Sequence, residues 1–227
     1  LQAFGQFSLP DERYRIASSD NTLLMANALP GTGSFTSMVN GSIYRFYETL
    51  GTSRPIFSPE GPDGTRELLG GKYYVTAEPE EGADILQKAS AGGKEFYLCE
   101  YENAVPIGSA YQTYMTEKDF LQVPKELRAA VMLECLIVPE EKEEEAALTM
   151  EKFDGSFEEK ISVEKLSEEY LDQLVSERVE NGIQSLEKDP EGFTAVLNTD
   201  GEGYAFFSVP HDDGFRAEVN GERVEIM

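Results

Sequence analysis

The chain of 227 residues has no tryptophan, one histidine and two cysteines, and these scarcities disfavour several classes of function. A zinc site of cysteine and histidine needs several ligands at short spacing, and no Cys-x-x-Cys pair is present. Carbohydrate-binding faces rely on stacked aromatic rings, often of tryptophan, so its absence disfavours a dedicated face of that kind. The 11 tyrosines leave sugar contacts through tyrosine open.

Both cysteines are predicted to be buried. Cys99 lies in a predicted strand, and Cys135 lies in a predicted helix on the same face as Leu127 and Val131. A buried cysteine behaves as a small apolar residue. A disulfide between the two cysteines stays open as an alternative.

The single histidine, His211, lies in a Pro-His-Asp-Asp-Gly segment shortly after Ser208. A catalytic triad needs a nucleophile, a base and an orienting acid that converge from separate elements, which neighbours in one turn cannot do. The sequence therefore predicts a surface turn here.

Among 43 acidic residues no pair of carboxylates stands out for glycoside hydrolysis. No catalytic, cofactor-binding or metal-binding residue is predicted, and a ligand site cannot be assigned.

Long apolar runs are also lacking. The longest, Ala129–Val138, is interrupted by Glu134 and is far shorter than the ~20 residues that cross a bilayer. The chain opens with Leu1 rather than methionine, from which we expect a piece of a longer or processed protein.

Basic residues are few: 19 Lys and Arg stand against 43 Asp and Glu, for a formal net charge of -24. Nucleic acids and anionic bilayers would be repelled, because binding them depends on Lys and Arg. The acidity is typical of a surface that keeps a protein dispersed. A surface that collects divalent cations or cationic partners is the alternative.

What is present suffices for a globular core, since 40% of the residues are hydrophobic and 11% aromatic. We expect one domain over 1–227, with a candidate subdomain boundary near 139–147, where the acidic run Glu140–Glu145 lies. The expected class is α+β: an antiparallel β-sandwich, with a jelly roll as one form, elaborated with several helices. Periodicity and turn residues predict helices over 21–28, 41–50, 124–136 and 166–186, and strands over 13–18, 72–76, 95–101, 108–115, 192–198, 204–210, 215–219 and 223–227. Two hairpins are predicted, one across 199–203 and one across Asn220-Gly221, a pair typical of type I′ turns.

Two further segments match binding motifs only in part. Gly31–Ser34 follows a proline and lacks the strand and helix that flank a phosphate-binding loop, so a plain loop is predicted. Asn198, Asp200 and Glu202 have the alternate spacing of a calcium loop. The twelfth position is Val209 instead of the bidentate glutamate, which favours a hairpin turn, with weak ion binding left open.

Several segments, in collinear order over most of the chain, resemble the YfhO family of bacterial membrane proteins. The C-terminal match is the most specific, although Phe215 stands where the family usually has tryptophan and His211 where tyrosine is common. The matching segments are Tyr14-Arg15-Ile16 with Asn21, Ser34-Phe35-Thr36-Ser37 with Asn40, Leu50-Gly51, Leu68-Leu69-Gly70-Gly71-Lys72-Tyr73-Tyr74, Tyr101–Gly108, Phe206-Phe207-Ser208-Val209-Pro210, Asp213-Gly214-Phe215 and Val219-Asn220-Gly221.

The resemblance implies a parent with many membrane helices of the GT-C glycosyltransferase type. Such proteins are implicated in adding sugars from a polyprenyl-phosphate donor to lipoteichoic acid or related envelope polymers outside the cell. The family's catalytic acid lies in the membrane part, so none is carried over to this chain. Family members generally continue past the last hairpin with further strands and a membrane helix, which implies that this chain is part of a longer protein.

The leading hypothesis is therefore a non-catalytic, extracellular accessory domain of a membrane glycosyltransferase. Its expected partners are the membrane-embedded part of the same polypeptide and, as a candidate, an envelope glycopolymer; nucleic acid is excluded. A free-standing or lipid-anchored glycan-binding module is the alternative, and a secreted hydrolase that uses carboxylates is the third hypothesis.

Overall fold

The computed structural model describes residues 7–17, 24, 29–33, 41–52, 61–153, 168–199 and 202–227. Its helices are α2 (Gly41–Leu50), α3 (Thr65–Leu68), α4 (Glu117–Phe120), α5 (Arg128–Glu134), α6 (Glu143–Ala146) and α8 (Glu168–Glu180), with 3-10 helices η1 (Lys125–Leu127) and η2 (Glu140–Lys142). Its strands are β1 (Arg15–Ile16), β2 (Gly71–Thr76), β3 (Asp84–Ala91), β4 (Lys94–Glu100), β5 (Gly108–Tyr111), β6 (Thr113–Thr116), β7 (Leu136–Val138), β8 (Glu151–Lys152), β9 (Ile183–Asp189), β10 (Gly192–Leu197), β11 (Tyr204–Phe207), β12 (Ala217–Val219) and β13 (Glu222–Val224).

Helices and antiparallel strands both contribute, which confirms the predicted α+β class. The described strands form one four-stranded sheet, β1-β2-β4-β3, one three-stranded sheet, β7-β6-β8, and the pairs β10-β9, β11-β5 and β12-β13. β1 runs parallel to β2, and β6 runs parallel to both of its neighbours. The narrower prediction of a β-sandwich or jelly roll is not confirmed, because these sheets are small and separate.

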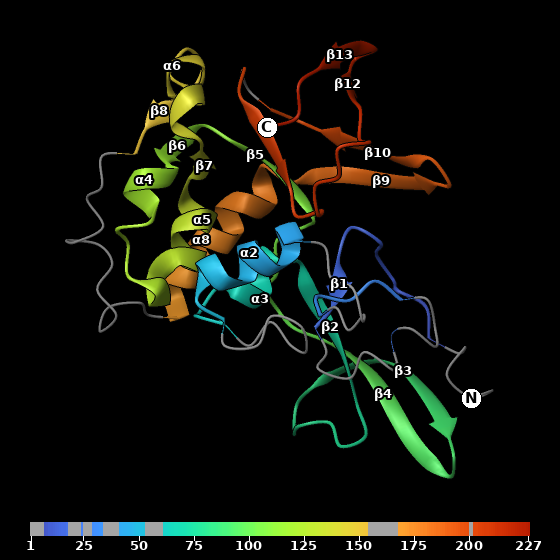
Figure 1. Cartoon of the computed structure of the whole chain (residues 1–227). Helices are drawn as coiled ribbons and strands as arrows, with labels where there is room; N and C mark the ends of the chain where they lie inside the picture. Colours follow the sequence, from blue (N-terminus) through green and yellow to red (C-terminus); the bar gives the residue numbers. More distant parts are fainter. Residues whose placement is uncertain are drawn as a thin grey trace.

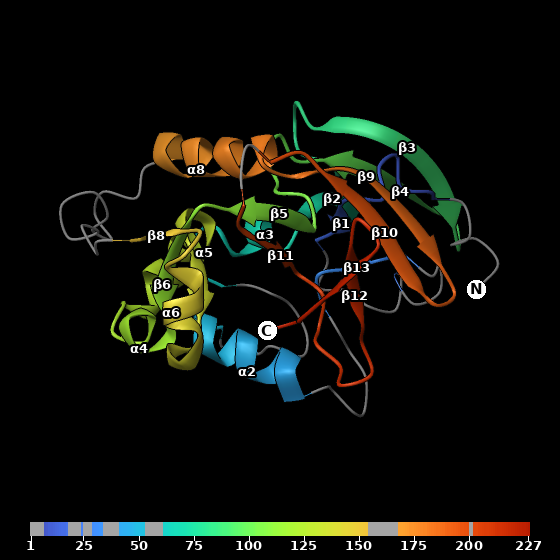
Figure 2. The same ribbon diagram turned by 90° about the horizontal axis from the view of Figure 1, so that it is seen from above.

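Helices α4, α5, α6 and α8 gather with the β6 sheet on one side of the molecule (Figure 1). The hairpin of β3 and β4 extends at the opposite end, and the C-terminal strands form a third region. In the view from above, α8 lies across the top of the helical side, and β9 and β10 project toward the side of β3 and β4 (Figure 2).

The buried side chains form several neighbouring apolar clusters. One lies under the four-stranded sheet and includes Ile16, Tyr73 and Leu98. Another joins α3, α5 and α8 through Leu68, Leu133, Leu174 and other residues. No helix of the described residues combines the length and the apolar character that crossing a bilayer requires.

Several predicted elements are confirmed with only small shifts at their ends. The helix over 41–50 is α2, the strands over 72–76 and 95–101 are β2 and β4, and the last hairpin is β12–β13. At its turn Asn220 and Gly221 both have positive φ, 54° and 83°, as a type I′ turn requires. The strand over 13–18 is the short β1, and β3 was not predicted. The helix over 21–28 lies outside the described residues except for Leu24.

The predicted strand over 108–115 is wrong as one element. The chain bends at Gln112, and β5 pairs antiparallel with β11 while β6 pairs parallel with β7 and β8. The helix over 124–136 is likewise shorter, consisting of η1 and α5. Cys135, predicted to be helical, is extended (φ -141°, ψ 155°), because the chain turns there into β7.

The predicted helix over 166–186 ends at Glu180, and Ile183 and Leu186 belong to β9. At this end the Glu177 carbonyl accepts from both the backbone N–H (3.3 Å) and the side-chain amide (2.9 Å) of Asn181, and the next N–H, of Gly182, donates to the Val179 carbonyl three residues back (3.1 Å). A Cβ on Gly182 would lie 2.5 Å from the Pro106 ring, so the chain passes close to another segment where the helix stops.

The predicted hairpin across 199–203 is also wrong, because β10 pairs with β9 and β11 pairs with β5. The actual turn is Asp189–Gly192. The Asp189 carboxylate accepts from the backbone N–H groups of Glu191 (2.7 Å) and Gly192 (2.8 Å), and this local turn brings β10 back along β9.

The acidic run Glu140–Glu145 forms η2 and most of α6 rather than an extended linker. Ala146, at the end of α6, is fully buried against the cluster that contains Tyr111 and Val138. The division into subdomains near 139–147 stays a prediction.

Candidate functional site

The residues considered for a catalytic triad have other roles in the structure. Ser208 accepts a hydrogen bond from Arg15 (2.6 Å) and donates to the Ile107 carbonyl (3.3 Å), beside the β5–β11 pair. His211 instead lines an open hollow of about 580 Å³ beside the last hairpin. Among the described residues that line this hollow there is no serine, so the structure does not bring Ser208 and His211 together in a triad.

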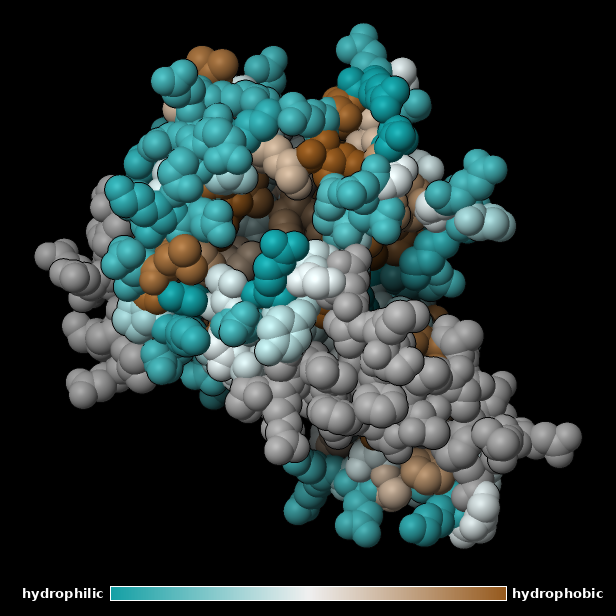
Figure 3. All heavy atoms as spheres, in the orientation of Figure 1, coloured by the Kyte–Doolittle hydropathy of each residue, from teal (hydrophilic) through white to brown (hydrophobic). Residues whose placement is uncertain are grey.

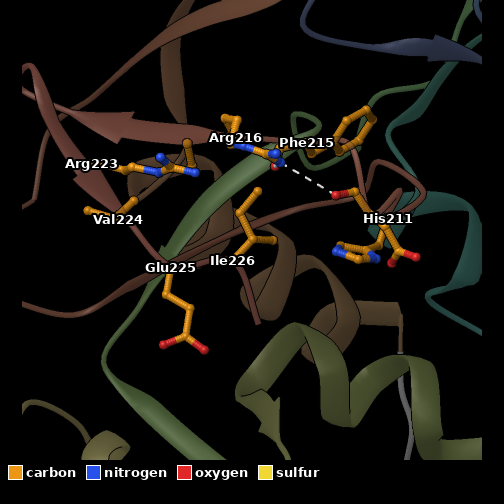
Figure 4. Close-up of a pocket in the computed structure, with 9 residues that line it drawn as sticks. His211, Phe215, Arg216, Arg223, Val224, Glu225 and Ile226 are labelled. Atoms are coloured by element: carbon orange, nitrogen blue, oxygen red, sulfur yellow. Dashed lines mark hydrogen bonds between the residues drawn. The ribbon is translucent and has the colours of Figure 1, made fainter.

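The hollow combines cationic and apolar side chains. Ile226 lies at its centre between Arg223 and His211, and Glu225 points away (Figure 4). Arg216 donates to the carbonyls of its own turn, the shortest bond being 2.7 Å to Phe215, and Glu225 pairs with Lys142 (2.8 Å). Both charged groups are thus already engaged within the protein. The hollow has the character of a hairpin surface rather than that of an enclosed active site.

The other motifs and the cysteines do not form a site either. The N–H of Thr32, which a phosphate loop would direct at an anion, donates to the Ile16 carbonyl (3.0 Å), while Ser34 and Asp200 lie outside the described residues. Within the part of the chain that the structure describes, no group of three or more His, Cys, Asp or Glu residues is placed to hold a metal ion. Cys99 and Cys135 are buried free thiols, so the two cysteines do not form the disulfide that the sequence left open. Burial raises the pKa of both thiols.

A more distinctive surface lies on the outer face of the four-stranded sheet. Tyr74 is paired with Cys99 across β2 and β4, and Thr76 with Tyr97, so their side chains share one face. Tyr101 continues this alternation just beyond β4, where its N–H donates to the Lys72 carbonyl (2.7 Å). Residues of the opposite face, such as Leu98, fill the apolar cluster below.

This surface, here called the tyrosine face, consists of Tyr74, Tyr97 and Tyr101 together with Ile85, Lys88 and Glu95. Its three tyrosines are half-buried, whereas Ile85 is 47% exposed. The pairing of Ile85 with Cys99 and of Lys88 with Tyr97 places β3 residues on the same face. The face therefore offers partly exposed rings next to charged groups.

Two sets of contacts fix the rings. The Tyr74 and Tyr101 rings lie 4.5 Å apart between centroids, and the Arg66 guanidinium lies 4.1 Å from the centroid of Tyr101. Arg66 is itself held by the carbonyls of Gly71 and Asn103, both at 2.9 Å. These contacts leave the stacked pair little rotational freedom, so a ligand would meet an ordered aromatic surface.

At the other end of the face, Tyr97 donates to Glu95 (3.0 Å), and Lys88 pairs with Glu95 (2.6 Å). Lys88 lies 5.5 Å from the centroid of the Tyr97 ring. Partial burial raises the pKa of Tyr74, so its hydroxyl, protonated at neutral pH in any case, keeps its proton further into alkaline solution. A sugar ring fits such a surface chemically, because its C–H face can lie on tyrosine while its hydroxyls meet the polar groups.

Sequence reasoning left sugar contacts through tyrosine open but did not locate them. The sequence feature that could have located this face is the alternation of residues along 96–101. In a strand, Tyr97, Cys99 and Tyr101 point to one face, and the residues between them point to the other. Ile85 and Lys88 were missed because β3 was not predicted. Compared with models of protein families, with curated proteins and with solved structures, the chain has no match.

Proposed function

We propose that the chain is a non-catalytic, extracytoplasmic accessory domain of a larger membrane protein of the YfhO type, and that its tyrosine face holds a sugar polymer. The family and the location rest on the collinear sequence resemblance. The binding role rests on one observation, the ordered stack of Arg66, Tyr101 and Tyr74 on a partly exposed sheet face.

The described positions of the resemblance are compatible with a structural role. Gly70 has φ of 76°, and a Cβ there would lie 3.2 Å from the Val105 carbonyl, so glycine suits both the turn and the close approach. Asn220 and Gly221 form a tight turn, and Phe206 and Phe207 belong to β11 beside β5. These residues maintain the shape of the domain, which is the role expected of an accessory domain without its own chemistry.

The net charge of the domain limits the kinds of polymer that it is expected to bind. With a formal charge of -24, the domain repels a polyphosphate backbone, so uncharged sugar substituents are the preferred ligand. Binding to glycosylated lipoteichoic acid is therefore expected to exceed binding to the same polymer without sugars. Titration of the domain with both polymers by calorimetry measures this difference.

Tyr101→Ala is expected to weaken binding to glycosylated lipoteichoic acid about tenfold, or about 1.4 kcal/mol, because it removes the central ring of the stack. Tyr44→Ala is the matched control, since Tyr44 is 46% exposed on α2, away from the sheet face. Circular dichroism checks that both variants fold. Equal affinity of the two variants would contradict a binding role for the tyrosine face.

The membrane parent is tested separately by immunoblotting fractionated native cells, with and without protease added to intact cells. A band far above 25.2 kDa in the membrane fraction, shortened by external protease, is expected for an exported domain of a polytopic protein. A soluble or singly anchored band near that mass would contradict it. The free-standing or lipid-anchored glycan-binding module would then be the better function.

A further inference from the structure

Strand β10 differs in composition from the rest of this acidic chain. Its six residues, Gly192–Leu197, read Gly-Phe-Thr-Ala-Val-Leu and carry no charge and no proline, whereas 27% of the whole chain is charged. Its partner β9 contains Glu187, Lys188 and Asp189. An uncharged run of β-prone residues pairs readily with other strands when its edge is open.

The edge of β10 is open among the described residues. The strand pairs antiparallel with β9 alone, and no described residue forms a backbone hydrogen bond with its other side. The tip of the hairpin projects from the body of the molecule in the view of Figure 1. A two-stranded ribbon is marginally stable by itself, and each added strand stabilises it.

The side chains of β10 divide into two faces. Phe193 packs on Phe207 with 5.3 Å between ring centroids, so its face is turned toward β11. Val196, on the other face, is 50% exposed, and Phe193 itself is still 40% exposed. Apolar residues also lie on the surface over the C-terminal strands (Figure 3). The face of Phe193 therefore offers apolar contacts to an incoming strand, and the face of Val196 is exposed beside it.

Natural sheets protect open edges with lysine, proline or a bulge placed within the strand. β10 has none of these over Gly192–Val196, and its one irregularity of register follows Val196. We propose that the open edge of β10 is a docking site for an extended strand of a partner polypeptide in which apolar residues alternate with Lys or Arg. Main-chain hydrogen bonds provide the attachment, and the apolar residues pack beside Phe193. The Lys or Arg residues then lie on the face of Val196, which Thr194 shares with Glu187.

Charge decides between this partner and a second copy of the chain. Two copies with a formal charge of -24 each repel one another. Locally, Glu187 faces Thr194 across the hairpin, and Asp189 and Glu191 form its turn. Two described basic residues near the hairpin are already paired with carboxylates: Lys188 lies 3.4 Å from Glu12, and Arg13, at the base of the hairpin, lies 2.6 Å from Asp11. A strand with Lys or Arg complements this acidic surrounding.

The probe is a capped eight-residue peptide of alternating valine and lysine, with binding measured by fluorescence anisotropy. Saturable binding is expected, together with slower amide hydrogen exchange over 192–197. The control peptide has the same side chains but carries an N-methyl group on every internal amide, so it keeps the charge and cannot donate the main-chain hydrogen bonds from either edge. It is expected to bind at least about tenfold more weakly.

Val196→Lys is expected to weaken peptide binding about tenfold, because it places a like charge on the edge strand. Val219→Lys is the matched variant: Val219 is 57% exposed on β12, so it adds the same charge to another exposed strand. Three results would overturn the proposal: no saturable binding, equal binding of the two peptides, or equal weakening by the two variants. So would light scattering that detects a dimer which Val196→Lys dissociates, because the occupant would then be a second copy.

Discussion

Replacing Arg128 with methionine is expected to lower the free energy of unfolding by about 3–5 kcal/mol, a large part of the stability of an ordinary domain. Arg128 is 7% exposed and donates to the carbonyls of Thr49 (2.6 Å), Leu121 (2.9 Å) and Val123 (3.0 Å). Methionine fills the volume but leaves three part-buried acceptors without their donor. Urea unfolding followed by circular dichroism measures the loss.

The size of this effect follows from where the three acceptors lie. One is in α2, and the other two belong to the segment between α4 and η1, so a single guanidinium joins parts of the chain 79 residues apart. Lysine cannot replace it, because one ammonium group does not reach three carbonyls in a planar fork. Arg45→Met is the control: Arg45 is exposed and makes one long hydrogen bond of 3.4 Å, so a change below about 0.5 kcal/mol is expected. Similar losses in the two variants would contradict the role given to Arg128.

Such a contact shows why part of the fold could be predicted from the sequence and part could not. The helix α2 and the turn at Asn220-Gly221 are specified by neighbours within a few residues: apolar spacing in the one, tolerance of positive φ in the other. The carbonyls that Arg128 contacts are set by the tertiary fold. An arginine in a helical pattern is ordinarily expected at the surface, and nothing local distinguishes this one.

The errors in strand pairing have the same origin. Alternation predicted the strands at 192–198 and 204–210 but not their partners, and adjacency along the chain suggested that they pair with each other. The competing signal was local and lies in Asp189, just before the strand at 192–198. Its carboxylate in fact organises the β9–β10 turn.

The tyrosine face was predictable only in part. Alternation assigns Tyr97 and Tyr101 to one side of a strand, but the stack needs Tyr74 from β2 and Arg66 from α3. Their meeting depends on the register of β2 with β4, which pairs Tyr74 with Cys99. A shift of one residue would turn Tyr74 to the opposite face, so the site depends on a register that the sequence alone leaves open.

The other large expected effect is a loss of stability in alkaline solution, to which two buried tyrosines contribute. Tyr47 and Tyr111 are 5% and 2% exposed, and burial raises the pKa of each from 10.0 to about 12. Tyr111 donates to the Met132 carbonyl (2.7 Å) and Tyr47 donates to the Thr32 carbonyl. A phenolate cannot donate these hydrogen bonds, so the folded state resists ionisation that the unfolded chain undergoes freely.

The sign follows from the raised pKa. Below pH 10.0 both states keep the phenol protons, and the full stability is present. As pH rises from 10.0 toward about 12, the unfolded chain loses these protons first, and stability falls by about 2–3 kcal/mol for each tyrosine.

Urea unfolding across this pH range measures the decline, with phenolate absorbance as the direct signal of ionisation. Tyr111→Phe is expected to have a lower free energy of unfolding at neutral pH, but this free energy should fall less as the pH rises. Tyr44→Phe, at an exposed position, is expected to show the same fall in the free energy of unfolding as the unchanged protein. A stability that stays level through this range would show that neither buried hydroxyl contributes to the pH dependence of folding.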